Sequence, residues 1–122
     1  MKPFEEIVAP YQEQLKKLTY TISEDRLSPT IYLFQQWAYR VEKGWYGFDL
    51  EGVPFTWANI IDAFMRELAI AAPKFKIHQI KLKFGGLRFY VDLKVRSKRA
   101  AKEIYTEIGK LEAALFHEKL IY

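Results

Sequence analysis

The sequence predicts an α+β fold in which three or four helices pack on a short antiparallel β-hairpin, within a sheet of two or three strands. Two observations lead to this expectation. Apolar residues recur at three- and four-residue steps in four parts of the chain, and one segment between them alternates apolar and polar residues around a glycine pair. The chain has 122 residues, of which 50% are hydrophobic, so we expect a single domain spanning 1–122.

The N-terminal segment is predicted to form two short helices or one kinked helix, because Pro10 interrupts an otherwise helical pattern. A second helix is expected to begin at Ser28. Serine followed by Pro29 places a cap and a first-turn proline in their preferred positions, and Gly44 supplies the end. Val41 belongs to the inward-facing stripe of this second helix.

Two longer helices complete the helical part. One is predicted from about Thr56 to Ala72, where Pro73 ends it, and the other begins near Ser97 and reaches close to the C-terminus. Residues 44–54, which precede the first of these helices, combine three glycines with several aromatic residues. They are predicted to form a loop whose rings, at residues 44–48, turn inward onto the domain. The alternative is an exposed aromatic patch, which would indicate a binding site.

The hairpin is expected within residues 74–96, with a two-residue loop at Gly85 and Gly86, because both central residues of a type I′ turn need positive φ. This register pairs Phe84 with Leu87, Leu82 with Phe89 and Ile80 with Val91 on the core face, and Lys83 with Arg88, Lys81 with Tyr90 and Gln79 with Asp92 on the other face. Strict alternation would put Ile77 on the polar face, so we expect a β-bulge near His78.

The net charge of +4 conceals an uneven distribution. Residues 74–102 hold ten Lys or Arg and one acid, Asp92, a net charge of +9, whereas the rest of the chain holds nine basic and fourteen acidic residues, a net charge of −5. Lysine is common on exposed strands because it discourages edge pairing. Directly opposed cations and cations at a helix start are, however, mildly destabilising. The basic face is therefore either a solvated strand face or a surface for an anionic partner.

No catalytic or metal-binding motif is present. The chain has no cysteine, and its two histidines, His78 and His117, are isolated in sequence and lack any ligand spacing. Neither a nucleophile elbow nor a phosphate-binding loop occurs. The sequence therefore predicts a protein that is not an enzyme and that needs no cofactor and no metal.

The sequence also predicts a cytoplasmic protein that does not act at a membrane. It contains no run of 18 uncharged apolar residues, and the N-terminal "MKPFEEIVAP" places two glutamates where a signal peptide would have its apolar core. The absence of cysteine is compatible with a reducing compartment.

The run "IHQIKLKFGGLRFYVD" resembles a family of small uncharacterised bacterial and phage proteins that share a Q-x-K-x-K-F-G-x-L-R-F-Y motif. The matching positions are Gln79, Lys81, Lys83, Phe84, Gly85, Leu87, Arg88, Phe89 and Tyr90. Many relatives have glutamate where Leu82 stands and continue into a cysteine-containing tail that this sequence lacks. The resemblance, which covers about Gly44 to Glu107, implies a fold element rather than an activity.

The chain is also similar to immunity proteins of contact-dependent growth inhibition, which are single-domain, cytoplasmic, poor in cysteine and without catalytic residues. That likeness implies a protein that binds one cognate toxin domain and blocks it. Such inhibitors of nucleases often present acidic residues to a basic active site. The acidic residues that could serve in this chain are Glu24, Asp25, Asp49 and Glu51.

Two functions follow as hypotheses. The first is a non-enzymatic protein-binding domain of the immunity or antitoxin type, which neutralises a cognate protein toxin. Its expected contact residues are Lys81, Lys83, Arg88, Tyr90, Lys94, Arg96, Lys98 and Arg99, with the four acidic residues as the alternative. The second is a nucleic-acid-binding module that uses the basic hairpin and the start of the last helix, with Tyr90 stacking on bases.

Overall fold

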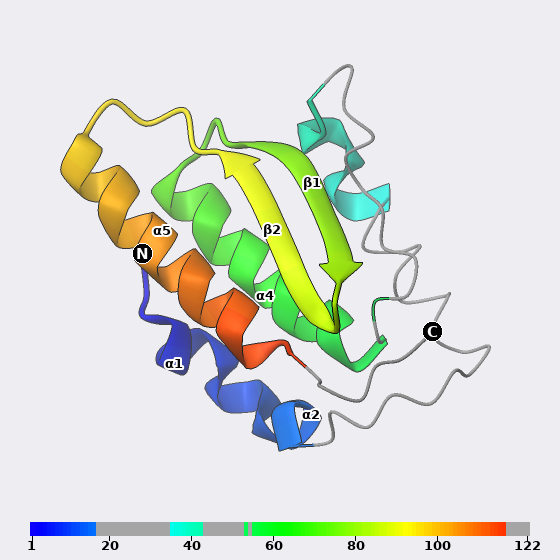
Figure 1. Ribbon diagram of the computed structural model, residues 1–122. Coiled ribbons are helices and arrows are strands. Elements are labelled where there is room, and N and C mark those ends of the chain that lie inside the picture. Colours follow the sequence, from blue (N-terminus) through cyan, green and yellow to red (C-terminus); the bar gives the residue numbers. More distant parts are fainter. Residues whose placement is uncertain (17–34, 43–52, 54, 117–122) are drawn as a thin grey trace.

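The fold of this computed structural model is α+β, as the sequence predicts, and the structure describes residues 1–16, 35–42, 53 and 55–116 (Figure 1). A two-stranded antiparallel sheet packs against helices. In chain order the elements are α1 (Phe4–Val8), the 3₁₀ helix η1 (Ala9–Tyr11), α2 (Gln12–Lys16), the 3₁₀ helix η3 (Ala38–Arg40), α4 (Phe55–Ala71), β1 (Lys76–Lys83), β2 (Gly86–Asp92) and α5 (Lys98–Ala114).

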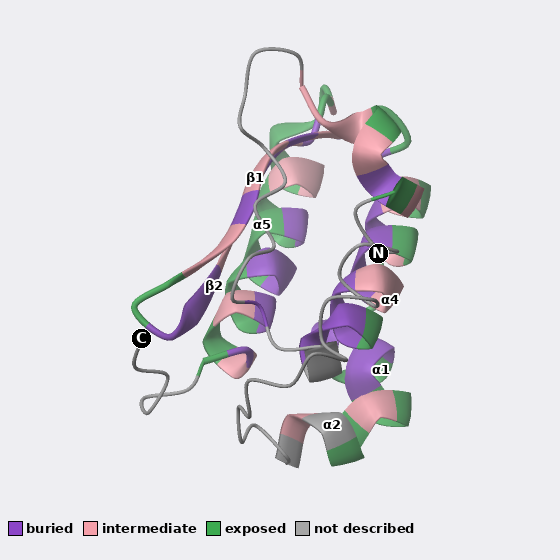
Figure 2. Ribbon diagram, turned by 90° about the vertical axis from the view of Figure 1, so that its right-hand side faces the viewer, coloured by how far each residue is buried: buried purple, intermediate pink, exposed green. Residues whose placement is uncertain are grey.

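The hydrophobic core lies between the hairpin and the two long helices, where the buried positions of β2, α4 and α5 face one another (Figure 2). The ring of Phe64 on α4 meets the ring of Phe89 on β2 edge to face, with centroids 5.7 Å apart. Helix α1 packs on both α4 and α5 and closes the core on its other side. No helix in the described ranges combines the length and apolarity that crossing a bilayer requires.

The boundaries of α1, α2 and α4 and the start of α5 agree closely with the sequence pattern. Pro10 separates α1 from α2 by a 3₁₀ turn, which confirms the prediction of two short helices. Helix α4 ends one residue before the predicted Ala72, and α5 begins directly after Ser97. The Ser97 hydroxyl oxygen accepts a hydrogen bond from the backbone N–H of Ala100 at 3.1 Å, so Ser97 is the N-cap.

The second helix ends earlier than predicted. Its start at Ser28 lies outside the described residues, but residues 35–37 are helical and η3 ends at Arg40. Val41 is extended and forms a parallel bridge with Ile77, and the backbone N–H of Glu42 donates to the carbonyl of Ile77 at 3.0 Å. The prediction that the helix includes Val41 is therefore wrong. Open hydrogen-bonding groups on the edge of β1 pair with this segment instead.

The hairpin forms as predicted, but its turn lies one residue earlier. Lys83 pairs with Gly86, so the two loop residues are Phe84 and Gly85, with φ of 52° and 79°. The predicted Gly85–Gly86 loop is wrong, and so is the predicted burial of Phe84, whose ring is exposed. The observed register pairs Leu82 with Leu87, Ile80 with Phe89 and Ile77 with Val91 on the inner face, and Lys81 with Arg88, Gln79 with Tyr90 and Lys76 with Asp92 on the outer face.

The predicted β-bulge is confirmed, because the register shifts between Ile77 and Gln79 and leaves His78 as the extra residue. Gly86 is needed for a different reason from the one predicted. A Cβ at this position would lie 3.0 Å from the ring of Phe116, so the absence of a side chain makes room for that ring. Phe116 follows α5 and forms an antiparallel bridge with Gly86.

Residues of α5 and the residue that follows it provide hydrogen-bond partners for backbone groups on the free edge of β2. The backbone N–H of Leu87 donates to the carbonyl of Leu115 at 3.0 Å, and that of Phe89 donates to the Glu112 carboxylate at 3.0 Å. Further along, the Tyr105 hydroxyl donates to the carbonyl of Val91 at 3.3 Å. These contacts hold α5 beside β2 and cover a strand edge that would otherwise be free to pair with another chain.

Candidate functional site

Three cations gather near the turn on the outer face of the hairpin. Lys81 and Arg88 are cross-strand neighbours, and Lys83 pairs with Gly86 at the end of β1. We call these three residues the basic tip. Among the described residues, no carboxylate forms an ion pair with any of them. Their charges are therefore directed at solvent or at a partner.

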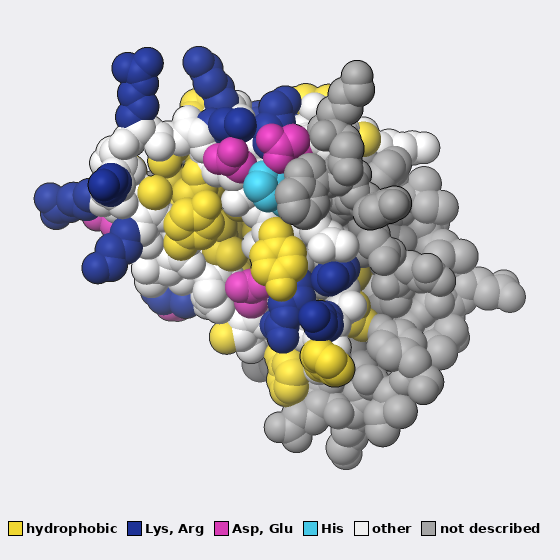
Figure 3. All heavy atoms as spheres, turned by 45° about the horizontal axis from the view of Figure 1, so that its top comes forward, with side chains coloured by type: hydrophobic (Ala, Val, Ile, Leu, Met, Phe, Trp, Pro, Cys, Tyr) yellow, Lys and Arg dark blue, Asp and Glu magenta, His cyan; other side chains and the backbone are white. Residues whose placement is uncertain are grey.

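Exposed aromatic rings surround the basic tip (Figure 3). Phe84 is 84% exposed in the turn, and Lys83 places its ammonium 5.6 Å from the centroid of the Phe84 ring. Phe116 lies over Gly86, and Tyr90 follows Arg88 along the same face of β2. Aromatic side chains next to arginine dominate the energetics of protein interfaces, so this combination favours contact with another macromolecule.

A groove of about 540 Å³ runs between β2 and α5, next to Tyr90. Its walls come from the bulge of β1, from β2 and from one side of α5, with the exposed ring of Tyr105 at its rim. Gly109 lies in this wall, and a Cβ at this position would meet no described atom within 4 Å apart from its own helix. The groove extends the outer face of the hairpin with an apolar surface.

Lys94, another predicted contact residue, is paired with two carboxylates. Its ammonium lies 3.2 Å from Asp92 and 3.8 Å from Glu42, and the His78 imidazole nitrogen Nε2 lies 2.6 Å from Glu42. The backbone N–H and then the ammonium of Lys94 hold the pKa of Asp92 below its ordinary value, because both favour the ionised carboxylate. Glu42, His78 and Asp92 are far apart in the sequence, and nothing in their spacing predicts that they meet.

The start of α5 forms a second basic group, away from the tip. Arg96, Lys98 and Arg99 are exposed, and Arg99 pairs with Glu103 at 3.6 Å on the same helix. The seven residues of β2 span about 20 Å, and Figure 1 shows the start of α5 beyond the end of β2 that is opposite the turn. The structure therefore divides the eight predicted contact residues into the basic tip with Tyr90, the paired Lys94, and this helix-start group.

The alternative acidic residues Glu24, Asp25, Asp49 and Glu51 lie outside the described residues, as does the aromatic loop 44–48.

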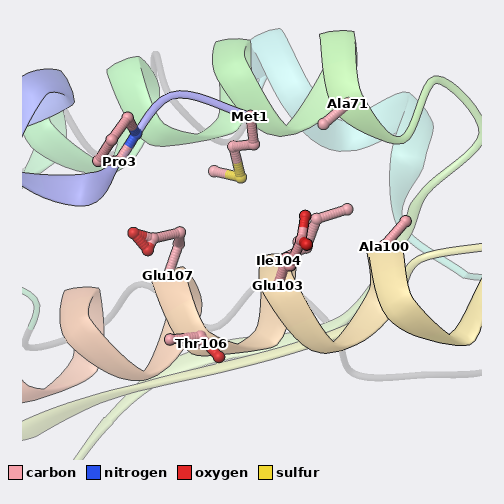
Figure 4. Close-up of a pocket in the computed structure, with 8 residues that line it drawn as sticks. All are labelled: Met1, Pro3, Ala71, Ala100, Glu103, Ile104, Thr106 and Glu107. Atoms are coloured by element: carbon pink, nitrogen blue, oxygen red, sulfur yellow. The ribbon is translucent and has the colours of Figure 1, made fainter.

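A separate hollow of about 420 Å³ lies between the N-terminal segment, the end of α4 and α5 (Figure 4). Glu107 points from α5 toward Pro3 in this view. Its carboxylate accepts a hydrogen bond from the backbone N–H of Phe4 at 3.1 Å and another from the Lys110 ammonium at 3.1 Å. Glu107 is thus occupied in joining α1 to α5, which is a structural role.

The outer side of the hairpin has the features of a surface that binds another macromolecule. Cations, rings and an apolar groove share the outer side of the hairpin. Of the nearby carboxylates, Glu42 contacts His78, Asp92 contacts Lys94, and Glu112 accepts a hydrogen bond from the backbone N–H of Phe89. Phe84, Phe116 and Tyr105 are exposed contact candidates that the sequence did not predict, because helical or strand periodicity does not reveal which rings stay outside. No protein-family model matches this chain, and neither a curated protein nor a solved structure is significantly similar to it.

Proposed function

We propose that this protein is a non-enzymatic protein-binding domain of the immunity or antitoxin type, which binds an acidic surface of a toxin through the outer face of its hairpin. The observation that carries the proposal is the basic tip. Lys81, Lys83 and Arg88 lie beside exposed rings, with no ion-pair partner in the described part of the chain. Opposed cations reduce hairpin stability, so a partner's carboxylates explain their placement better than folding does.

The distribution of charge favours a protein partner over nucleic acid. A phosphate backbone is tracked by a continuous positive groove. On the face shown in Figure 3, the dark blue side chains form separate groups, with yellow, magenta and cyan ones between them. Protein interfaces commonly combine apolar anchors, arginine and a polar rim in this way. Nucleic-acid binding by the basic hairpin and the start of α5 stays a prediction that the same experiments test.

The first test is affinity capture with the full chain from cells that carry its gene, including the products of neighbouring genes. We expect one dominant protein partner in a one-to-one complex. The complex formed by Arg88→Ala or Tyr90→Ala should have a dissociation constant roughly 30-fold higher, corresponding to about 2 kcal/mol for an interface anchor. Isothermal titration calorimetry with the purified partner measures both changes.

Arg99→Ala is the matched control for Arg88→Ala, because Arg99 is exposed at the far basic group and its side chain pairs only within α5 among the described residues. It should leave the affinity unchanged. Equal losses for the two variants would contradict binding through the basic tip. Because Arg88 faces Lys81 across the hairpin, Arg88→Ala should not reduce the free energy of unfolding, so loss of binding cannot be ascribed to loss of fold.

Labelled DNA and RNA, mixed with the protein over a salt series, test the nucleic-acid hypothesis. Retention at low salt that falls by orders of magnitude at moderate salt, together with failure to capture a protein, would replace the proposal. If the protein retained neither DNA nor RNA at low salt, the nucleic-acid hypothesis would be wrong.

A further inference from the structure

Tertiary structure brings three potential metal ligands together at the end of the hairpin opposite the turn. Glu42 lies on the extended segment that pairs with β1, His78 is the extra residue of the bulge, and Asp92 ends β2. One ligand atom of each residue lies within 4.8 Å of the ligand atoms of the other two. All three side chains are partly buried, so they are held in place and still reachable from solvent.

We propose that Glu42, His78 and Asp92 form a zinc-binding site. An imidazole nitrogen and two carboxylate oxygens are ligands that Zn²⁺ accepts at about 2.0–2.2 Å, and the nitrogen favours zinc over magnesium or calcium. Ligand atoms of a tetrahedral zinc site lie roughly 3.3 Å apart. His78 Nε2 and Glu42 Oε2 are 2.6 Å apart, and the ligand atoms of all three residues lie within 4.8 Å of one another, so movements of about an ångström would bring them to this spacing. Water would complete the coordination.

The β-bulge supports this assignment. Bulges re-aim side chains and often occur next to functional sites. Because of the register shift, Ile77 stays in the core opposite Val91 while Gln79 turns to the outer face opposite Tyr90. The shift makes His78 the extra residue of the bulge and places its imidazole beside Glu42, which itself is fixed by the hydrogen bond from its backbone N–H to the carbonyl of Ile77.

Lys94 already occupies the position of a competing cation. Its ammonium lies 3.2 Å from Asp92 and 3.8 Å from Glu42, and its side chain is 43% exposed, so it can turn into solvent when a metal ion replaces it. The backbone N–H of Lys94 donates to Asp92 Oδ1 at 3.1 Å and orients this carboxylate independently of the ammonium. Removal of the ammonium alone should therefore strengthen metal binding.

The test uses the full chain without a histidine tag, freed of metal by a chelator and titrated with zinc sulfate in a calorimeter. We expect one Zn²⁺ per chain, with affinity at least about tenfold lower in His78→Ala and Asp92→Asn and higher in Lys94→Gln. Magnesium chloride should bind far more weakly. The midpoint of thermal unfolding should rise with zinc concentration in the wild type but not in His78→Ala.

Two controls keep the proposal falsifiable. His117→Ala removes the other histidine, and Lys98→Gln removes a lysine at the start of α5. Both should bind zinc like the wild type.

Asp92 is 41% exposed at a strand end, so Asp92→Asn should stay folded even if His78→Ala does not, and circular dichroism checks both. Absence of saturable binding up to millimolar zinc, an unchanged affinity in His78→Ala or Lys94→Gln, or a loss in His117→Ala would overturn the proposal. The site is independent of the proposed function.

Discussion

Glu107 is a buried charged residue whose role becomes clear only from its partners. Pro3, at the N-cap of α1, has no side chain that can accept a hydrogen bond, and the Glu107 carboxylate supplies the acceptor for the N–H of Phe4 from a different helix. Lys110 balances its charge and also contacts Glu5 at 3.3 Å. Hydrogen bonds to Glu107 and then Glu5 raise the pKa of Lys110, because both favour the charged ammonium.

Glu107→Ala should lower the free energy of unfolding by about 1–3 kcal/mol, because it leaves the N–H of Phe4 without an acceptor and opens the contact between α1 and α5. Glu107→Gln keeps an oxygen acceptor and should cost less. Urea denaturation of both variants measures the difference. A loss under about 0.5 kcal/mol in Glu107→Ala would mean that water replaces the carboxylate there.

The turn of the hairpin carries a strained residue. Phe84 has a φ of 52°, and a residue with a side chain other than Asn or Asp pays roughly 1–2 kcal/mol in this left-handed conformation. Its ring is 84% exposed, so packing within the described part of the molecule does not compensate for the strain. Strain of this kind tends to persist where function requires the side chain, in agreement with an aromatic contact at the basic tip.

Phe84→Asn should raise the free energy of unfolding by about 1 kcal/mol, because Asn-Gly is a preferred type I′ turn. The same variant should weaken the complex with the partner, because the exposed ring is lost. Phe84→Ala is the matched control: it removes the ring and keeps an unfavourable residue at positive φ. Chemical denaturation and calorimetry compare the two. If Phe84→Asn were no more stable than Phe84→Ala, the backbone strain would not be significant.

At the scale of the whole molecule, the charge is divided between a basic third and an acidic remainder. Electrostatic attraction between an acidic partner and the basic tip would speed the first encounter. We expect the association rate constant with the captured partner to fall about tenfold between low and physiological salt, with a smaller change in the dissociation rate. Surface plasmon resonance over a salt series measures both rates.

The double variant Lys81→Gln with Lys83→Gln should flatten this salt dependence, since it removes two of the three cations of the basic tip. Lys98→Gln, at the start of α5, is the comparison and should change it little. A larger effect of Lys98→Gln than of the double variant on the salt dependence of association would show that the partner first meets α5 and not the hairpin.

Local patterns in the sequence determined which elements form. The three- and four-residue apolar spacing, Pro10 and the Ser97 cap lead to the helices found, because these signals act within one or two turns of chain. The alternation of apolar residues around a glycine pair likewise predicted the hairpin. Ile77 is out of phase with that alternation, and this predicted the bulge. The fold class followed, since amphipathic helices must bury their apolar faces against such a sheet.

Only the tertiary structure decided the register and the sites. Phe84-Gly85 and Gly85-Gly86 could each have formed the two-residue turn. The observed register places Gly86 against the ring of Phe116, thirty residues further along the chain. Glu42, His78 and Asp92 meet because the segment at Val41 pairs with β1, and no spacing in the chain encodes that contact. The physical reason is the same in both cases: periodicity reports the side of an element that a residue faces, whereas the partner on that side is chosen by packing between distant segments.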